Sequence, residues 1–199
     1  MIPAATPAMD LDALVIGRAG MDLYPRPIGT KTKDAETFFA DMGGSAGNIA
    51  AAMASLGMKV ALAAPVSDDP VGRFVARRLA SLGIEHVTPE PVEGSARTSL
   101  ALAETIAEGS ETIIYRNGAA DFELQGADLA RHTSRARTVI ATGTALAQEP
   151  SRGATLKALA DAAFAVLDLD YRPYSWASLD EARLVYAEAA EKADLVVGN

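Results

Sequence analysis

The sequence contains no cysteine, and its only histidines are His86 and His132. Without cysteine the chain can form neither a disulfide nor a thiolate metal site, and a reducing compartment suits such a composition. The two histidines are far apart in the sequence, which excludes a metal centre built from several histidines. We therefore assign no residue of this chain as a metal ligand.

Positive charge is also scarce, with 18 lysines and arginines against 26 acidic residues and a net charge of -8. A chain of this charge has little with which to neutralise a nucleic-acid backbone, so we expect no nucleic-acid partner. Long hydrophobic runs are missing too. The longest apolar zone, residues 49–66, is interrupted by Ser55, Gly57 and Lys59 and is too broken to span a membrane.

Residues 1–10 contain Pro3 and Pro7 but no basic residue. A secretory signal peptide begins with basic residues followed by an apolar run, so this stretch is predicted to be a flexible tail. Together with the absence of cysteine and of a membrane span, it leads us to expect a cytoplasmic protein.

What the chain does have is a regular alternation of short apolar runs and amphipathic segments. Strands are predicted at residues 11–17, 59–66, 84–87, 138–142, 165–170 and 194–197, and helices at 48–56, 70–82, 126–132, 152–163 and 179–191. This alternation indicates an α/β fold with a mostly parallel sheet covered by helices on both faces.

Two stretches break the alternation. Residues 18–40 are punctuated by prolines and a glycine, and residues 97–117 contain two strand-like runs joined by a short polar turn. Two such runs are typical of a hairpin. We predict a small β lid beside the main sheet, and one α/β domain over residues 11–199.

The last predicted strand is followed only by Gly198 and Asn199. A terminal strand with no covering helix would leave one sheet face open. We therefore expect a truncated chain in which the C-terminal part of the fold is missing.

The stretch Asp41-Met42-Gly43-Gly44-Ser45-Ala46-Gly47-Asn48 leads directly into a predicted helix. Glycines at this place let a ligand approach the backbone, and the start of a helix offers free N–H groups. An ordinary turn before a helix would look the same. Asp22 follows the first predicted strand, at the sheet edge where ligands of open α/β folds bind. It is a candidate acceptor for ligand hydroxyls, with a solvated loop carboxylate as the alternative.

Arg116 follows the predicted hairpin, and Arg172 follows a predicted buried strand. A guanidinium can hold a carboxylate or phosphate through two parallel hydrogen bonds. The alternatives are a solvated Arg116 and an Arg172 that pairs on the surface with Asp170 or Glu181. Trp176 is expected to be a packing anchor beside the Arg172 turn.

The stretch Gly43-Gly44-Ser45-Ala46-Gly47-Asn48-Ile49-Ala50, followed by Gly57, Asp68-Asp69 and Gly72, resembles the first signature of the ribokinase-like (PfkB) carbohydrate kinases. Gly17-Arg18-Ala19-Gly20-Met21-Asp22-Leu23-Tyr24-Pro25 resembles the strand and acidic residue that receive the sugar in that family. Asp168-Leu169-Asp170-Tyr171-Arg172-Pro173 with Trp176 is similar to the branch that acts on keto-deoxy sugar acids. Within that branch, kinases of 5-dehydro-2-deoxygluconate in inositol catabolism are most similar, and kinases of 2-keto-3-deoxygluconate are the alternative.

The resemblance implies a ribokinase-like fold and a kinase that uses ATP and Mg²⁺ to phosphorylate the primary hydroxyl of a keto-deoxy sugar acid. Asp22 would bind sugar hydroxyls, glycines and an asparagine would form the floor, and two arginines would hold the carboxylate end. The β lid would cover the sugar and could form a homodimer contact. The substrate-binding residues so implied are Asp22, Gly43, Gly44, Asn48, Arg116 and Arg172.

Asn199 matches the first residue of the family's Asn-x-x-Glu motif, which is linked to magnesium and phosphate, and is the implied cofactor-binding residue. The family's second signature, an Asp-Thr-x-Gly-Ala-Gly-Asp-like stretch with the catalytic Asp, is absent. We therefore expect no catalytic residue in this chain, a base beyond Asn199, and no activity from the chain alone. Ser67 stands where the family has glycine, which predicts a little backbone strain.

Two other functions fit parts of the sequence. A non-catalytic sugar-acid-binding or dimerisation module could share the same first half. A dinucleotide-binding domain is disfavoured, because Gly17-Arg18-Ala19-Gly20 is followed by Pro25 and Pro27 and leaves no helix to receive a pyrophosphate.

Overall fold

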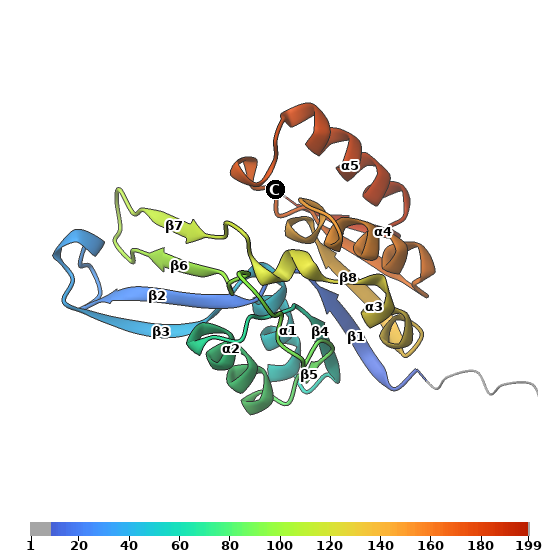
Figure 1. The fold of residues 1–199 in the computed structure, drawn as a ribbon, viewed down its shortest axis with the longest axis horizontal. Helices are drawn as coiled ribbons and strands as arrows, with labels where there is room; N and C mark the ends of the chain where they lie inside the picture. The colour runs from blue at the N-terminus through green and yellow to red at the C-terminus, as the bar shows by residue number, and fades with distance from the viewer. Residues whose placement is uncertain (1–8, 199) are drawn as a thin grey trace, which may run out of the picture.

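A computed structural model describes residues 9–198, which form two sheets (Figure 1). The larger sheet has the strand order β10-β9-β8-β1-β4-β5, and all its paired strands run parallel. The predicted parallel α/β architecture is therefore confirmed. The expected tail, apart from its last two residues, and Asn199 lie outside the described residues.

The strand β1 lies in the middle of the larger sheet, between β4 and β8. Its sequence, Leu-Asp-Ala-Leu-Val-Ile, is almost entirely buried, which suits a parallel strand covered on both faces. The strands are β1 (Leu11–Ile16), β4 (Val60–Ala63), β5 (Glu85–His86), β8 (Ala136–Thr142), β9 (Ala165–Asp168) and β10 (Leu195–Val197).

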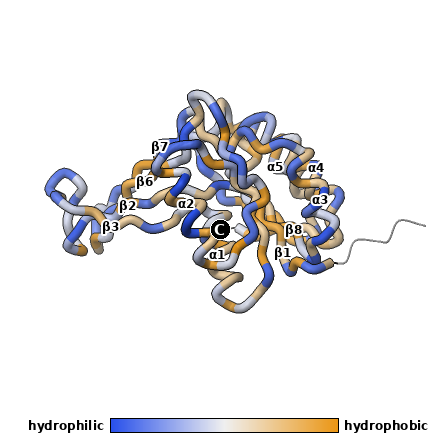
Figure 2. The backbone as a smooth tube through the Cα atoms, turned by 60° about the horizontal axis from the view of Figure 1, so that its bottom comes forward, coloured by the Kyte–Doolittle hydropathy of each residue, from blue (hydrophilic) through white to orange (hydrophobic). Residues whose placement is uncertain are grey.

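Helices cover the sheet on both faces. One core cluster joins β1 and β4 to α1 and α2, and another joins β1, β8 and β9 to α3, α4 and α5. Figure 2 shows that β1 and β8 run through the hydrophobic part of the molecule. The helices are α1 (Ser45–Ser55), α2 (Pro70–Ser81), α3 (Gly126–Thr133), α4 (Ser151–Asp161) and α5 (Leu179–Glu191).

The start of α1 differs from the prediction. The helix begins at Ser45, three residues before the expected start, and Gly44 is its N-cap with a φ of 94°. Gly47 was expected to lie before the helix, but it lies inside it, and a Cβ there would meet Ala19 at 3.4 Å. The helix therefore uses Gly47 for close packing.

The helix α2 ends at Ser81, one residue before the predicted end. Leu82 is its C-cap and is exposed, whereas Val75 and Leu79 are buried against the sheet. Among the described residues, no helix is long and apolar enough to cross a membrane.

The smaller sheet extends away from the main body, as Figure 1 shows, and occupies the place of the expected lid. Its order is β3-β2-β6-β7, with β2 parallel to β6 and antiparallel to β3. The strand β3 carries the chain from the lid directly to Gly44 and α1. The lid strands are β2 (Gly20–Arg26), β3 (Thr37–Gly43), β6 (Leu100–Ala103) and β7 (Thr112–Tyr115).

Candidate functional site

Asp22 lies inside strand β2, and not in a loop after β1 as the sequence suggested. The antiparallel pairing with β3 brings its carboxylate over Gly43, where a Cβ would lie 2.0 Å from the Asp22 Cγ. The backbone of Gly43 does not have a positive φ. Space for Asp22 is therefore the reason for glycine at this position.

Gly44 needs both its backbone conformation and its lack of a side chain. Its φ is 94°, and a Cβ would lie 2.3 Å from the carbonyl oxygen of Arg18. The same carbonyl accepts a hydrogen bond from the Gly47 N–H at 3.2 Å. The first turn of α1 is thus fixed against the segment that links β1 to β2.

The Asp22 carboxylate is partly buried and incompletely bonded. Its Oδ2 accepts a hydrogen bond from the Tyr24 hydroxyl at 3.3 Å, and its Oδ1 is buried without a partner among the described residues. Burial raises the pKa of Asp22, and the positive charge of Arg18 partly opposes that shift. The Oδ1 atom can accept a hydrogen bond from a ligand hydroxyl.

Arg116 is buried, which contradicts the solvated alternative. Its Nε donates to Asp121 Oδ2 at 3.1 Å, its Nη2 also pairs with that carboxylate, and its Nη2 donates to the Thr144 carbonyl at 2.8 Å. Its guanidinium lies 4.2 Å from the centre of the Phe122 ring. Nη1 is buried without a partner in the described residues. Arg116 therefore offers the two N–H donors of Nη1, and its charge is already balanced by Asp121.

Arg172 lies on the surface and pairs with Asp170, which is the alternative that the sequence left open. Its side chain is 51% exposed and pairs with Asp170 at 2.7 Å, while Glu181 pairs with Arg152. Asp170 has a φ of 32°, an uncommon left-handed conformation that turns the chain directly after β9. Arg172 and Tyr174 face the lid strand β7 across a cavity of about 430 Å³.

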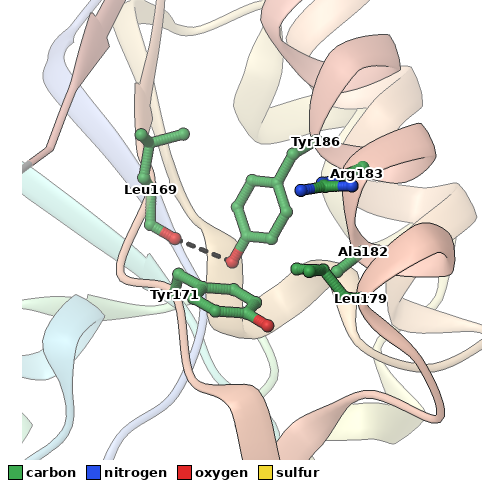
Figure 3. A pocket seen from close by; sticks show the side chains of 6 residues that line it. All are labelled: Leu169, Tyr171, Leu179, Ala182, Arg183 and Tyr186. Carbon is green, nitrogen blue, oxygen red and sulfur yellow. Dashed lines mark hydrogen bonds between the residues drawn. The ribbon is translucent and has the colours of Figure 1, made fainter.

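The loop that carries Arg172 is anchored from α5 (Figure 3). The Tyr186 hydroxyl donates to the Leu169 carbonyl at 2.8 Å, and Tyr171 packs edge-on against the Tyr186 ring. Burial raises the pKa of Tyr186, which keeps its hydroxyl protonated as a donor. Trp176 packs against the same ring and against the core, so the expected packing role is confirmed.

Three further positions were singled out by the sequence. Asn48 is exposed on the first turns of α1, and Asn199 lies outside the described residues. The prediction of strain at Ser67 is wrong, because its φ is not positive. Its hydroxyl bonds to Asp69 at 2.7 Å and to Thr98 at 2.9 Å, which fixes the turn before α2.

Sequence reasoning missed Arg18 as a site residue. Arg18 is 8% exposed, lies directly after β1, and donates from Nη1 to the Ser99 hydroxyl at 3.2 Å. Burial lowers the pKa of Arg18, and the carboxylates of Asp121 and Asp22 oppose that shift. The one signal for Arg18 in the sequence was its charged side chain between Gly17 and Ala19, just after the buried strand β1.

The structure therefore gathers Asp22, Gly43, Gly44 and Arg116 around Arg18, and it places Arg172 across a cavity from the lid. Hydroxyl groups connect the start of α1 to the end of β8, since Thr144 bonds to Thr142 at 2.7 Å and to Ser45 at 3.3 Å. Within the described residues, such an arrangement offers two unpartnered carboxylate oxygens, Asp22 Oδ1 and Asp121 Oδ1, and several donors. It lies at the carboxyl edge of a parallel sheet, where polar small molecules bind.

Comparison with known proteins gives a family for this chain. Residues 10–199 match the profile described as "pfkB family carbohydrate kinase". Two curated relatives share the name 5-dehydro-2-deoxygluconokinase. The one from Photobacterium profundum is 40% identical over 194 residues, and the one from Lacticaseibacillus casei is 39% identical over 197 residues. The matches cover 95% and 94% of this chain but only 59% of each relative.

Solved structures show the same fold. A PfkB protein from Polaromonas sp. JS666 superposes with a TM-score of 0.83 at 26% identity, covering 94% of this chain and 65% of that protein. An uncharacterized sugar kinase from Pyrococcus horikoshii, solved in complex with ATP, gives a TM-score of 0.81 at 23% identity. That match covers 92% of this chain and 62% of the kinase. The chain thus spans about three fifths of the length of these proteins.

Proposed function

This chain belongs to the pfkB family of carbohydrate kinases, and on that premise we propose that it forms the sugar-binding part of a kinase for a keto-deoxy sugar acid. The whole protein would transfer the γ-phosphoryl group of ATP to a primary hydroxyl, with 5-dehydro-2-deoxygluconate as the preferred substrate. The name shared by the two curated relatives supports that choice.

The observation that carries the proposal is the Oδ1 of Asp22, which is buried beside Gly43, close to the buried Arg18, and has no partner within residues 9–198. A carboxylate oxygen in this position suits the hydroxyl groups of a sugar, and nearby guanidinium groups suit its acidic end. In our proposal Gly43, Gly44 and Asn48 form the floor, and Arg116 Nη1 and Arg172 border the acidic end.

Phosphoryl transfer depends mainly on alignment and on charge stabilisation. Within residues 9–198, no three His, Asp or Glu side chains come together. Mg²⁺ in phosphoryl-transfer sites is usually held by one or two carboxylates together with substrate phosphates, and we assign none of the described residues to it. In our proposal Asn199 is the first residue that contributes to binding Mg²⁺ and the ATP phosphates, and the proton-accepting Asp belongs to sequence beyond it.

A coupled assay of ADP release tests the proposed activity. We expect no turnover from this chain alone. We expect sugar-acid-dependent turnover from the product of its gene if reading that gene past Asn199 reveals an Asp-Thr-x-Gly-Ala-Gly-Asp-like stretch. Turnover by the 199 residues alone would contradict the assignment of catalysis to sequence beyond Asn199. In the same assay, preference for 2-keto-3-deoxygluconate would replace the proposed substrate by the alternative.

Arg172→Ala in the active protein tests the carboxylate assignment. Loss of a charged hydrogen bond is expected to raise the KM for the acid sugar about tenfold and to leave kcat nearly unchanged. Arg183→Ala is the matched control, because Arg183 is 70% exposed on α5. An unchanged KM in Arg172→Ala would show that Arg172 does not bind the substrate.

The lid is a proposed homodimer contact. Phe38, Ile113 and Tyr115 are each at least 40% exposed, and the strand register places them on the same face of the lid. Apolar patches of this kind commonly mark interaction surfaces. Sedimentation of Phe38→Ser and of the unchanged chain would test it, with a loss of dimer expected in the variant.

A further inference from the structure

Two arginines are buried among the described residues, and Arg18 differs from Arg116 in having no carboxylate partner there. Arg18 is 8% exposed and Arg116 is 7% exposed. Arg116 is paired with Asp121, whereas within residues 9–198 Arg18 makes no ion pair, and its one side-chain hydrogen bond goes to the neutral hydroxyl of Ser99. Taking a cation out of water without an adjacent anion costs free energy. Such a group is a candidate for binding an anionic ligand.

The position of Arg18 is fixed from both sides. Its carbonyl is held by the first turn of α1, and its guanidinium reaches Ser99 at the base of the lid strand β6. Gly20 lets Ser99 come this close, because a Cβ on Gly20 would lie 2.5 Å from the Ser99 carbonyl oxygen. The guanidinium is therefore presented in one place.

The charges around Arg18 are those of the candidate site. Asp121, Arg116, Asp22 and Tyr174 all act on it electrostatically. Asp121 pairs with Arg116 through Oδ2, while its Oδ1 is buried without a partner within residues 9–198, and Asp22 is close but does not pair with Arg18. An acceptor, Asp22 Oδ1, and a donor, Arg18, thus lie in the same site without bonding to each other.

We propose that Arg18 is the specificity-determining residue that contacts the carboxylate of the sugar acid, while Asp22 takes its hydroxyl groups. This inference rests on the proposed function. Arg116 and Arg172 are engaged by Asp121 and Asp170, so a carboxylate gains most from the cation that has no acidic partner. Arg18 then distinguishes acidic from neutral sugars.

Calorimetric binding to this chain, without nucleotide, tests the proposal. The probes are 5-dehydro-2-deoxygluconate and its C1 amide, which has nearly the same shape but no charge. Arg18→Met is expected to weaken binding of the acid about 30-fold and to change binding of the amide less than about threefold. Arg18→Lys keeps the charge but not the two parallel N–H donors of a guanidinium. Its affinity for the acid is expected to fall about fivefold, with no change for the amide. Arg77→Met, on the exposed side of α2, is the matched control.

The outcomes separate two failures. If the unchanged chain binds neither probe, the proposed function is wrong, and the role of Arg18 falls with it. If the unchanged chain prefers the acid and both Arg18 variants keep that preference, the role of Arg18 alone is wrong. An equal loss on acid and amide would likewise overturn it, because that result indicates a structural role. Should Arg18→Met not fold, Arg18→Lys decides by the same comparison.

Discussion

At the scale of single residues, Asp22 is a partly buried carboxylate, and its burial disfavours the charged form. Burial raises its pKa, so the folded protein retains a proton at pH values where the unfolded chain has released it. The free energy of unfolding therefore falls as pH rises from the unfolded value of about 3.9 through the raised pKa. Asp22→Asn removes this loss. We expect the variant to exceed the unchanged chain in stability by a larger margin at about pH 7 than at about pH 4.

Urea denaturation at the two pH values measures that margin. Asp34→Asn is the control, because the Asp34 side chain is 63% exposed. The same Asp22→Asn variant is expected to bind the sugar acid at least about tenfold more weakly, since a charged acceptor is lost. An equal margin at both pH values would show that Asp22 is not under strain from burial.

Gly43 is also a position where function and packing meet. In Gly43→Ala the new methyl would lie within 2.1 Å of all three carboxyl atoms of Asp22, so the carboxylate must move. We expect sugar-acid binding to fall at least about tenfold and the free energy of unfolding to fall by about 1–3 kcal/mol. Gly126→Ala, where a Cβ meets nothing within 4 Å, is the control and should leave binding unchanged. Normal binding by Gly43→Ala would contradict the site.

The residue scale also shows where sequence reasoning ends. Gly43 and Gly44 could be identified from their motif, because glycines beside a helix start are a local pattern. Arg18 could not, because its burial depends on Ser99, which is 81 positions away. The engagement of Arg116 was equally hidden, since it depends on the carbonyl of Thr144 in the turn after β8.

At the scale of elements, the loop after β9 depends on α5. Tyr186→Phe removes the donor to the Leu169 carbonyl and is expected to lower the free energy of unfolding by about 1 kcal/mol. Tyr171→Phe is the matched control, because its ring packs on Tyr186 but its hydroxyl makes no hydrogen bond within the described residues. Thermal melting of both variants measures the difference. Equal melting temperatures would show that the hydroxyl contributes nothing to this anchor.

Elements with strong end signals could be predicted closely. The bounds of α5 agree with the prediction, and Ser178 caps that helix through the Glu181 N–H at 3.1 Å. Asp69 caps α2 in the same way, just before Pro70. The start of α1 could not be predicted, since no side chain caps it and its glycine inside the helix looked like a breaker.

At the scale of the whole molecule, the sheet ends in an exposed strand. Leu195, Val196 and Val197 of β10 are each more than 40% exposed, and among the described strands β10 pairs only with β9. Apolar edge strands favour association between chains. Val196→Lys is expected to reduce species larger than a dimer in light scattering, at an unchanged melting temperature. Leu184→Lys, an exposed leucine on α5, should have a smaller effect. Equal reductions in the two variants would show that the association depends on exposed apolar residues in general and not on the edge strand β10.

The central place of β1 has a consequence for how the chain folds during synthesis. The strand is made first among the described strands, yet its neighbour β8 ends at Thr142. The ribosome must therefore deliver more than a hundred further residues before β1 can pair on both sides. Pairings so distant in sequence form slowly. Until then the apolar strand has only β4 beside it, and we expect chaperones to meet the nascent chain in this interval.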